Sequence, residues 1–201
     1  MFMAKIITSE LAKKLINHTK FNIRLVQDEF LEELPVKFYS APAAGKWSAA
    51  SCLAHLNMTM EHYVPLMEKG KRAYVLKGKN PRSDYNQAWT GKLIEKYMNP
   101  IEVNQVKKLP SFKSINPGDS VSPDAQVIET FFEWNHRLMQ LMQSHKQSDW
   151  GKIKVQTLLR IPFRIQMGDA LILMTYHNYR HLIQALKACD ISYEKYRIES
   201  A

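Results

Sequence analysis

Cysteine, glycine and long apolar runs are scarce in this chain of 201 residues, and each scarcity excludes a class of protein. The two cysteines, Cys52 and Cys189, lie far apart and in no metal or redox spacing, so we expect reduced thiols and a cytoplasmic location. No stretch approaches the ~18 apolar residues of a transmembrane helix, and the N-terminal apolar run is too short for a signal peptide, so we expect no membrane partner. With seven glycines and few β-branched runs, the composition favours helix.

What the chain does contain is typical of a globular helical protein. Hydrophobic residues make up 45% and charged residues 23%, which argues against disorder. The length allows one domain or at most two, and no internal repeat or low-complexity segment divides it. We therefore expect a single domain over residues 1–201.

The net charge of +9 raises nucleic acid or an anionic surface as a partner. However, Lys and Arg are spread along the whole chain, and their densest run, residues 69–82, matches no known DNA-binding pattern. We expect a solvated basic surface with some affinity for anionic substrates, and a small-molecule substrate in place of a nucleic-acid partner.

Apolar residues recur at three- and four-residue spacing in four long segments, which predicts four amphipathic helices. Ser9 and Ser48 can cap the first two, and Ser122 followed by proline and an acid starts the third. Pro65 lies inside the second helix, so we expect a kink or a break there. The predicted helices cover residues 9–34, 49–76, 123–147 and 168–188, the last capped by Asp169.

The two longer connections differ in character. Residues 77–121 are rich in proline and glycine, with a short helical piece at 89–97; they either cover the mouth of a site or form a packed, shielding segment. Residues 152–155 alternate polar and apolar, which fits a short extended piece. The simplest architecture is an all-α four-helix bundle with a long, partly irregular connection between its second and third helices.

The fourth helix carries two histidines in an otherwise mostly apolar stripe. His177 and His181 are four residues apart, so their side chains lie on one face and both can reach one ion. A bare His-x-x-x-His pair is common by chance, but two imidazoles in a buried stripe need polar partners. A metal ion is one partner that satisfies both.

A catalytic metal usually has three protein ligands and one open position. His55, near the start of the second helix on a mostly uncharged flank, is the best third ligand; the alternative is a hydrogen-bonded core histidine. Gln184, one turn beyond His181, either orients a ligand or is a hydrogen-bonded core glutamine. Three further histidines, His18, His136 and His145, we assign to the surface or to helix ends, and His62 lies two turns beyond His55 on the same flank.

No general acid or base stands out from the sequence. Residues 178–180 are Asn-Tyr-Arg, so a His-Glu-x-x-His protease motif is absent. Glu61, Glu133 and Asp169 are candidates only by residue type, and the catalytic residues stay unassigned. Three histidines suit zinc, nickel, copper or iron almost equally well.

The histidine contexts resemble a known family, the DinB/YfiT-like metalloenzyme superfamily, over roughly residues 8–189. The resemblance is carried by Lys46-Trp47-Ser48 with Ala54-His55-Leu56, and by the run Tyr176-His177-Asn178-Tyr179-Arg180-His181-Leu182-Ile183-Gln184-Ala185. Weaker likeness lies in Trp89-Thr90-Gly91-Lys92 and in Lys108-Leu109-Pro110-Ser111-Phe112.

The resemblance implies an up-up-down-down four-helix bundle, frequent homodimers, and a divalent metal, most often nickel or zinc, on residues matching His55, His177 and His181. It also implies thiol-dependent transfer or isomerisation in some members and hydrolysis in others. We therefore expect a metal-dependent enzyme. It is either a thiol-dependent S-transferase that uses a low-molecular-weight thiol or a hydrolase. The alternative is a non-catalytic, metal- or ligand-binding dimeric bundle.

Overall fold

The structure is a computed structural model that describes residues 5–98, 113–118, 121–122, 126–158 and 163–196. Its described part is mainly helical, with two short antiparallel two-stranded sheets, β1 with β2 and β3 with β4, and no helix in it is both long and apolar enough to cross a membrane. The α-helices are α1 (Thr8–Val26), α2 (Ala49–Leu76), α3 (Trp89–Met98), α4 (Val127–Gln143) and α5 (Met167–Ala188). The strands are β1 (Lys5–Ile7), β2 (Asp84–Asn86), β3 (Lys154–Gln156) and β4 (Arg164–Gln166), and the short helices are η1 (Gln27–Leu31), η2 (Lys113–Ile115), η3 (Ser144–Gln147) and η4 (Glu194–Tyr196).

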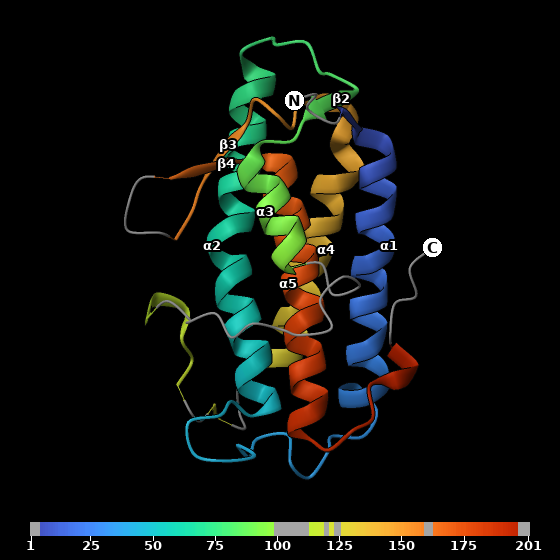
Figure 1. The fold of residues 1–201 in the computed structure, drawn as a ribbon, viewed down its shortest axis with the longest axis vertical. Helices are drawn as coiled ribbons and strands as arrows, with labels where there is room; N and C mark the ends of the chain where they lie inside the picture. The colour runs from blue at the N-terminus through green and yellow to red at the C-terminus, as the bar shows by residue number, and fades with distance from the viewer. Residues whose placement is uncertain (1–4, 99–112, 119–120, 123–125, 159–162, 197–201) are drawn as a thin grey trace.

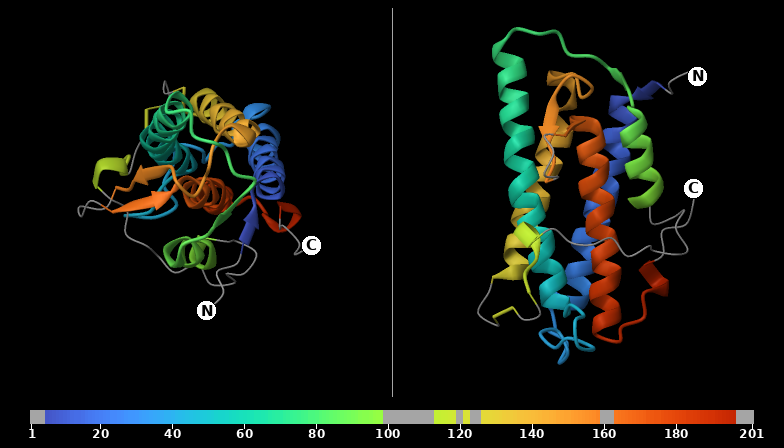
Figure 2. Two further views of the ribbon diagram at one scale, coloured as in Figure 1. Left: turned by 90° about the horizontal axis from the view of Figure 1, so that it is seen from above. Right: turned by 60° about the vertical axis from the view of Figure 1, so that its left-hand side comes forward.

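The four long helices pack side by side around one core (Figure 1). α2 packs against α4 and α5, and α1 packs against the same two helices, so α1 and α2 lie diagonally across the bundle. Figure 2 shows α3 as an added layer outside this bundle, where it packs on α5. The predicted all-α architecture and the short helical piece in the second connection are therefore confirmed.

The up-up-down-down order of the helices is not confirmed. The start of α1 lies beside the segment that follows α2, since the Thr8 amide donates to the Ser83 carbonyl at 2.8 Å. The start of α5 lies beside the segment that follows α4, since the Gly168 amide donates to the Trp150 carbonyl at 3.3 Å. Thus α1 and α5 run one way and α2 and α4 run the other, as Figure 1 shows.

The two connections explain this order. Residues 27–48 fold into η1 and a series of turns at one end of the bundle, where buried Phe38 accepts a backbone hydrogen bond from Ala50 at 3.0 Å. This segment does not span the bundle, so α2 returns antiparallel to α1. The longer connection from α2 to α4 leads from one end of the bundle to the other, so α4 runs parallel to α2 (Figure 2).

The predicted helix ends are confirmed at α2 and only in part elsewhere. The Ser48 hydroxyl accepts a hydrogen bond from the Ser51 amide at 3.1 Å and caps α2 as expected. α2 then continues through Pro65 as one helix, so of the predicted kink or break the break is wrong and the kink stays a prediction; proline removes one hydrogen bond, and packing on α4 and α5 maintains the helix. Ser9 does not cap α1, which begins at Thr8. The predicted start of the third helix lies largely outside the described residues.

Buried amides fix how the helices sit along one another. The Asn178 amide group donates to the Asn135 side-chain oxygen at 3.0 Å and ties α5 to α4. The Asn22 amide group donates to the Thr175 carbonyl at 3.1 Å and ties α1 to α5. Because a buried polar group without a partner costs free energy, these bonds disfavour sliding of α5 along its neighbours.

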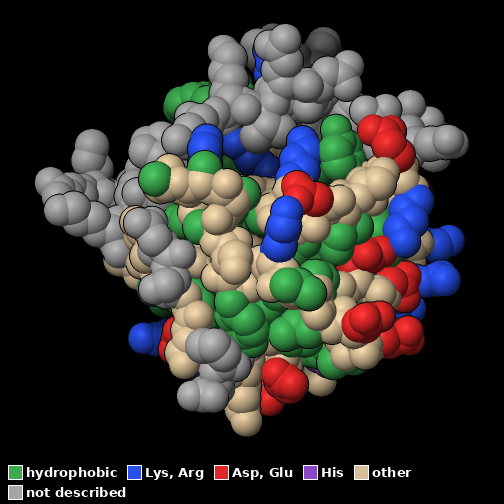
Figure 3. Space-filling view, turned by 90° about the horizontal axis from the view of Figure 1, so that it is seen from below, with side chains coloured by type: hydrophobic (Ala, Val, Ile, Leu, Met, Phe, Trp, Pro, Cys, Tyr) green, Lys and Arg blue, Asp and Glu red, His purple; other side chains and the backbone are tan. Residues whose placement is uncertain are grey.

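The end of the bundle where the α1–α2 connection turns has an apolar centre with acidic side chains to one side. In Figure 3 apolar side chains gather in the middle of this end, with acidic side chains to one side. Leu31, Leu34 and Val36, from η1 and the connection after it, are exposed apolar residues of this segment.

α3 is held on α5 by a close contact at Asp169. A Cβ atom added at Gly91 would overlap the Asp169 carboxyl group, so only glycine lets α3 approach this near. The Tyr85 hydroxyl from β2 donates to Asp169 Oδ1 at 3.4 Å. Asp169 is 1% exposed and makes no cap; the residue before α5 is Gln166, with no side-chain cap bond, so the predicted capping role is wrong.

Burial raises the pKa of Asp169 to about 7, and this shift gives the fold a testable pH dependence. The unfolded chain loses this proton near pH 4 while the folded chain keeps it to about pH 7, so the Asp169 contribution destabilises the fold as pH rises across that window. Asp169→Asn cannot ionise and still accepts from Tyr85. Between pH 4 and pH 7.5 the free energy of unfolding of wild type should therefore fall relative to that of Asp169→Asn, by on the order of 3 kcal/mol.

Chemical denaturation of both proteins at several pH values measures this difference. Asp190→Asn, at an exposed ion pair with Lys37, is the control and should show no comparable change with pH. A difference between Asp169→Asn and wild type that stays constant from pH 4 to pH 7.5 would contradict the prediction.

Candidate metal centre

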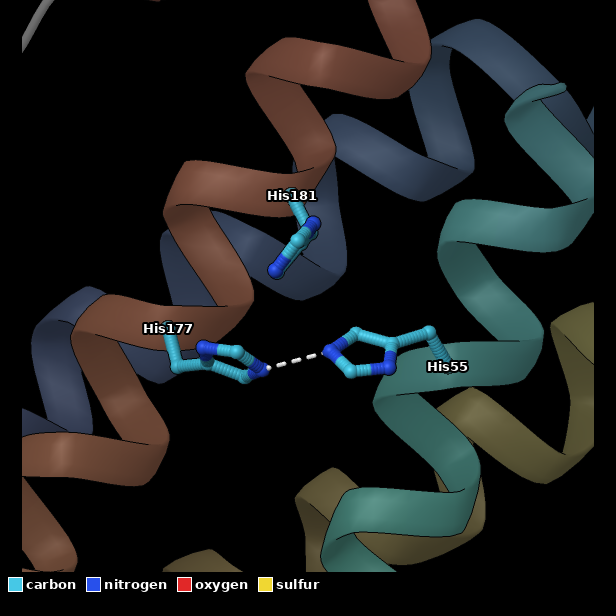
Figure 4. A group of neighbouring side chains, drawn as sticks. All are labelled: His55, His177 and His181. Carbon is cyan, nitrogen blue, oxygen red and sulfur yellow. Dashed lines mark hydrogen bonds between the residues drawn. The ribbon is translucent and has the colours of Figure 1, made fainter. Parts of the chain in front are cut away.

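His55 lies on α2, two turns beyond the Ser48 cap, and is 2% exposed. Its Nδ1 atom lies 2.6 Å from the backbone carbonyl oxygen of Ile115. A carbonyl oxygen only accepts hydrogen bonds, so Nδ1 carries the proton and donates it. The Nε2 atom of His55 is therefore unprotonated; it points away from α2 toward α5 and accepts a hydrogen bond from Nε2 of His177 (Figure 4).

His177 and His181 project from consecutive turns of α5 toward His55 (Figure 4). The Nε2 atoms of His55 and His177 lie 3.0 Å apart, and one ligand nitrogen from each of the three rings lies within 4.8 Å of the others. The structure thus brings together all three histidines that the sequence predicted as metal ligands.

Gln184 holds the third ring. Its Oε1 atom accepts from His181 Nδ1 at 3.0 Å, which again leaves the Nε2 atom of that ring as the unprotonated one. The Gln184 side chain is exposed, so the alternative of a core glutamine is wrong. A hydrogen bond from the outer ring nitrogen to a carbonyl or amide oxygen is what metal-binding histidines usually have.

The three rings stay neutral near pH 7. Burial lowers the pKa of His55, against the raising effect of its bond to Ile115. Burial and the neighbouring imidazoles lower the pKa of His177 well below its ordinary value. Burial, the charge of His55 and that of Arg180 lower the pKa of His181 to about 3. Neutral imidazole is the form that binds a metal ion.

Trp47 closes one side of the cluster, a role that the sequence did not reveal. Its ring lies 4.8 Å from the His55 ring and 5.8 Å from the His181 ring, centroid to centroid. No residue pattern in the sequence placed this ring beside the histidines. The signal that pointed to this position was the resemblance, since Trp47 belongs to the Lys46-Trp47-Ser48 motif.

A pocket of about 380 Å³ lies beside the cluster. His177 lines it, together with residues of α2, α3, β4 and α5 and the Ile115 side chain. His177 and His181 are partly exposed, so the expectation of a fully buried stripe is wrong for these two rings.

The residues present fit a divalent ion. Nitrogens that lie ~2.0 to 2.1 Å from one ion are at most ~4.2 Å apart. The 3.0 Å between the His55 and His177 nitrogens satisfies this limit, and all three ligand nitrogens lie within 4.8 Å of one another, close to it. Among the described residues no fourth His, Cys, Asp or Glu joins the group. Three neutral nitrogens with no further ligand match the donor set of an open metal site, and they suit zinc, nickel, copper or iron.

The remaining candidates lie elsewhere. His18, His136 and His145 are not part of the cluster, as expected. Glu61 and Glu133 are exposed, and Asp169 is buried beneath α3, so within the described chain none of these carboxylates lines the pocket. The absence of an evident general acid or base in the sequence thus also holds for the described structure.

The depressed imidazole pKa values predict that the metal-free fold loses stability in acid. Below about pH 6.5 the unfolded chain binds protons that the folded cluster does not accept, so the free energy of unfolding falls as pH falls. His181→Gln removes one such group and keeps an amide at the position. We expect the loss of stability between pH 7 and pH 4.5, measured by denaturation in chelator, to be smaller in this variant than in wild type.

His136→Gln, at an exposed position on α4, is the matched control and should leave the wild-type pH slope unchanged. Equal slopes for His181→Gln and wild type would show that the cluster does not resist protonation.

Comparison with known proteins agrees with this site. A family model described as the DinB superfamily matches residues 24–185, a range that contains all three histidines. A search of curated proteins found no significant match, and a search of solved structures found none either. The match spans most of the chain, and the chain therefore belongs to the DinB superfamily.

Proposed function

We propose that this member of the DinB superfamily is a divalent-metal-dependent enzyme whose metal is held by His55, His177 and His181. The observation that carries the proposal is the cluster itself: three neutral imidazoles from two helices converge, and one of them, His177, lines a pocket. A closed structural site would instead have a fourth protein ligand. Nickel and zinc are the ions we propose, from the resemblance.

The chain's own residues prepare the ligands in three ways. The Ile115 carbonyl and the Gln184 amide oxygen fix the ring tautomers of His55 and His181, so each presents a lone pair. The Trp47 ring packs against the His55 and His181 rings and limits the approach of water to them. A divalent ion in this position supplies Lewis acidity and lowers the pKa of a water or thiol that it binds.

For the reaction class we propose thiol-dependent group transfer, with a low-molecular-weight thiol as the second substrate. A thiol becomes a strong nucleophile once its proton is lost, so this chemistry does not require a carboxylate base in the pocket. Hydrolysis usually uses such a base, and none lines the described pocket. The homodimer and the cytoplasmic location stay predictions.

Metal binding is the first test. Purified protein, stripped with chelator and titrated with Ni²⁺ or Zn²⁺, should bind about one ion per chain by calorimetry and elemental analysis. His181→Ala removes one of three ligands, and we expect at least a hundredfold loss of affinity. The visible d–d bands of bound Ni²⁺ or Co²⁺ should disappear with it.

His136→Ala is the control, because it removes an exposed imidazole outside the cluster and should bind the ion like wild type. If wild type takes up no ion, or if the His181→Ala and His136→Ala proteins bind it equally, the proposed site is wrong.

The reaction class is tested by comparing two substrates on the metal-loaded protein. We expect it to accelerate the attack of a small thiol on an aryl halide, followed by absorbance, more than it accelerates hydrolysis of an aryl ester. His55→Ala should abolish the thiol reaction. Faster hydrolysis than thiol transfer would favour the hydrolase alternative, and a loaded protein inert in both assays would favour the non-catalytic bundle.

A further inference from the structure

The pocket beside the cluster is chemically distinct from the rest of the surface. Its walls come from α2, α3, β4 and α5, and its volume is about 380 Å³. Most lining side chains are apolar, among them Leu93, Ile94, Phe163 and Leu173. The polar ones are threonines, Tyr63 and His177, so no side chain that lines the described pocket carries a full charge near neutral pH.

This lack of charge is not a property of the protein in general. The chain has a net charge of +9, and the other large pocket, between α2 and α4, is lined by Lys71, Arg72 and Arg137 beside Glu68. A charged ligand that entered the pocket beside the cluster would lose hydration and find no ion pair on the described walls. Those walls therefore select against charge and favour an apolar guest.

The polar groups on these walls are partly engaged elsewhere. The Thr59 hydroxyl donates to the backbone carbonyl of His55 at 2.8 Å, and the Thr157 hydroxyl donates to the carbonyl of Phe163 at 2.9 Å. The Tyr63 oxygen accepts from the Leu158 amide at 3.4 Å. Because these hydroxyl groups bond to the protein itself, much of the surface that a bound molecule would touch is apolar.

The outer wall is formed by α3 and presents large apolar side chains to solvent. Trp89 is 72% exposed and Leu93 is 45% exposed, and both line the pocket. Apolar side chains gathered at the rim of a concave site are typical of ligand-binding surfaces. A guest there would cover surface that is otherwise in contact with water.

The size of the pocket limits the guest. A volume of 380 Å³ holds roughly a dozen non-hydrogen atoms, if each takes about the 30 Å³ that a water molecule occupies in the liquid. A linear chain of about eight carbons or a two-ring aromatic group fits this volume. Such a guest would have one end beside His177, which lines the same pocket.

We propose that this pocket binds a neutral, apolar group of the substrate, about the size of an octyl chain, with its reacting end toward His177. The orientation rests on the proposed metal function, whereas binding of the apolar group does not. The substrate class is therefore a small, uncharged hydrophobic molecule that carries one polar reacting group.

The test uses 1-octanol as a neutral probe that displaces the fluorescent dye Nile red from the full-length protein stripped of metal. We expect octanol to bind at least tenfold more tightly than either octylammonium or octanoate in this form, because the two ions must be desolvated without a partner. Loading with Ni²⁺ should leave the octanol affinity unchanged. Octanol that fails to bind, or that binds no better than both ions, would overturn the proposal.

Two variants locate the probe. Leu93→Lys places a charge on the pocket wall and should weaken octanol binding at least tenfold, and Leu93→Ala should weaken it less. Leu34→Lys is the matched control: Leu34 is 43% exposed, against 45% for Leu93, and lies outside the pocket. Thermal melting checks that both lysine variants fold. If Leu34→Lys weakens octanol binding and Leu93→Lys does not, the probe binds outside the pocket and the proposal is overturned.

A third probe separates this proposal from the metal function. Octane-1-thiol has the same chain and a head group that binds metal, so it should gain at least tenfold in affinity when the protein carries Ni²⁺. If octanol binds in the pocket but the thiol gains nothing in protein shown to carry Ni²⁺, the orientation toward the cluster is overturned. If the protein takes up no Ni²⁺, the metal function fails and the octanol result still decides the pocket.

Discussion

The antiparallel packing of α2 against α5 is the constraint on which the rest of the site depends. His55 stands on one helix and His177 and His181 on the other, so their nitrogens meet only at one axial offset of the two helices. Two buried hydrogen bonds hold α5 in place: the Asn178 side-chain amide donates to Asn135 on α4, and the Asn22 side-chain amide on α1 donates to the Thr175 carbonyl. A shift of α5 by one turn, ~5.4 Å, would separate the ligands and leave these amides unpaired.

The surroundings of the cluster favour a ligand role over a proton-transfer role. Burial and mutual repulsion lower the pKa of His177 and His181, so protons do not compete with a cation near neutral pH. The partners on the outer nitrogens of His55 and His181 turn both lone pairs inward. On the pocket side the described walls contribute no carboxylate. The chemistry at such a site depends on the bound ion and the substrate, with the chain supplying position and an apolar environment.

Sequence patterns predicted the features that depend on nearby residues. The Ser48 cap, the extents of α2 and α5 and the short α3 helix follow from capping chemistry and periodicity within one segment. The errors concern contacts between segments. Pro65 does not break α2, and Asp169 does not cap α5; both outcomes are decided by packing partners that a local pattern does not contain. The contact of Trp47 with two histidines has the same origin.

The sequence by itself determined that four amphipathic helices form and that two of the proposed ligands share a helix face, because a four-residue spacing places side chains on one side of any helix. Tertiary structure decided that His55 joins them, since only the offset of α2 and α5 brings together residues 122 positions apart in the chain. Tertiary structure also decided the direction of each helix: the α1–α2 connection stays at one end of the bundle, and the α2–α4 connection leads from one end to the other. The pocket likewise exists only in three dimensions, because its walls come from segments far apart in sequence that meet when α3 packs on α5.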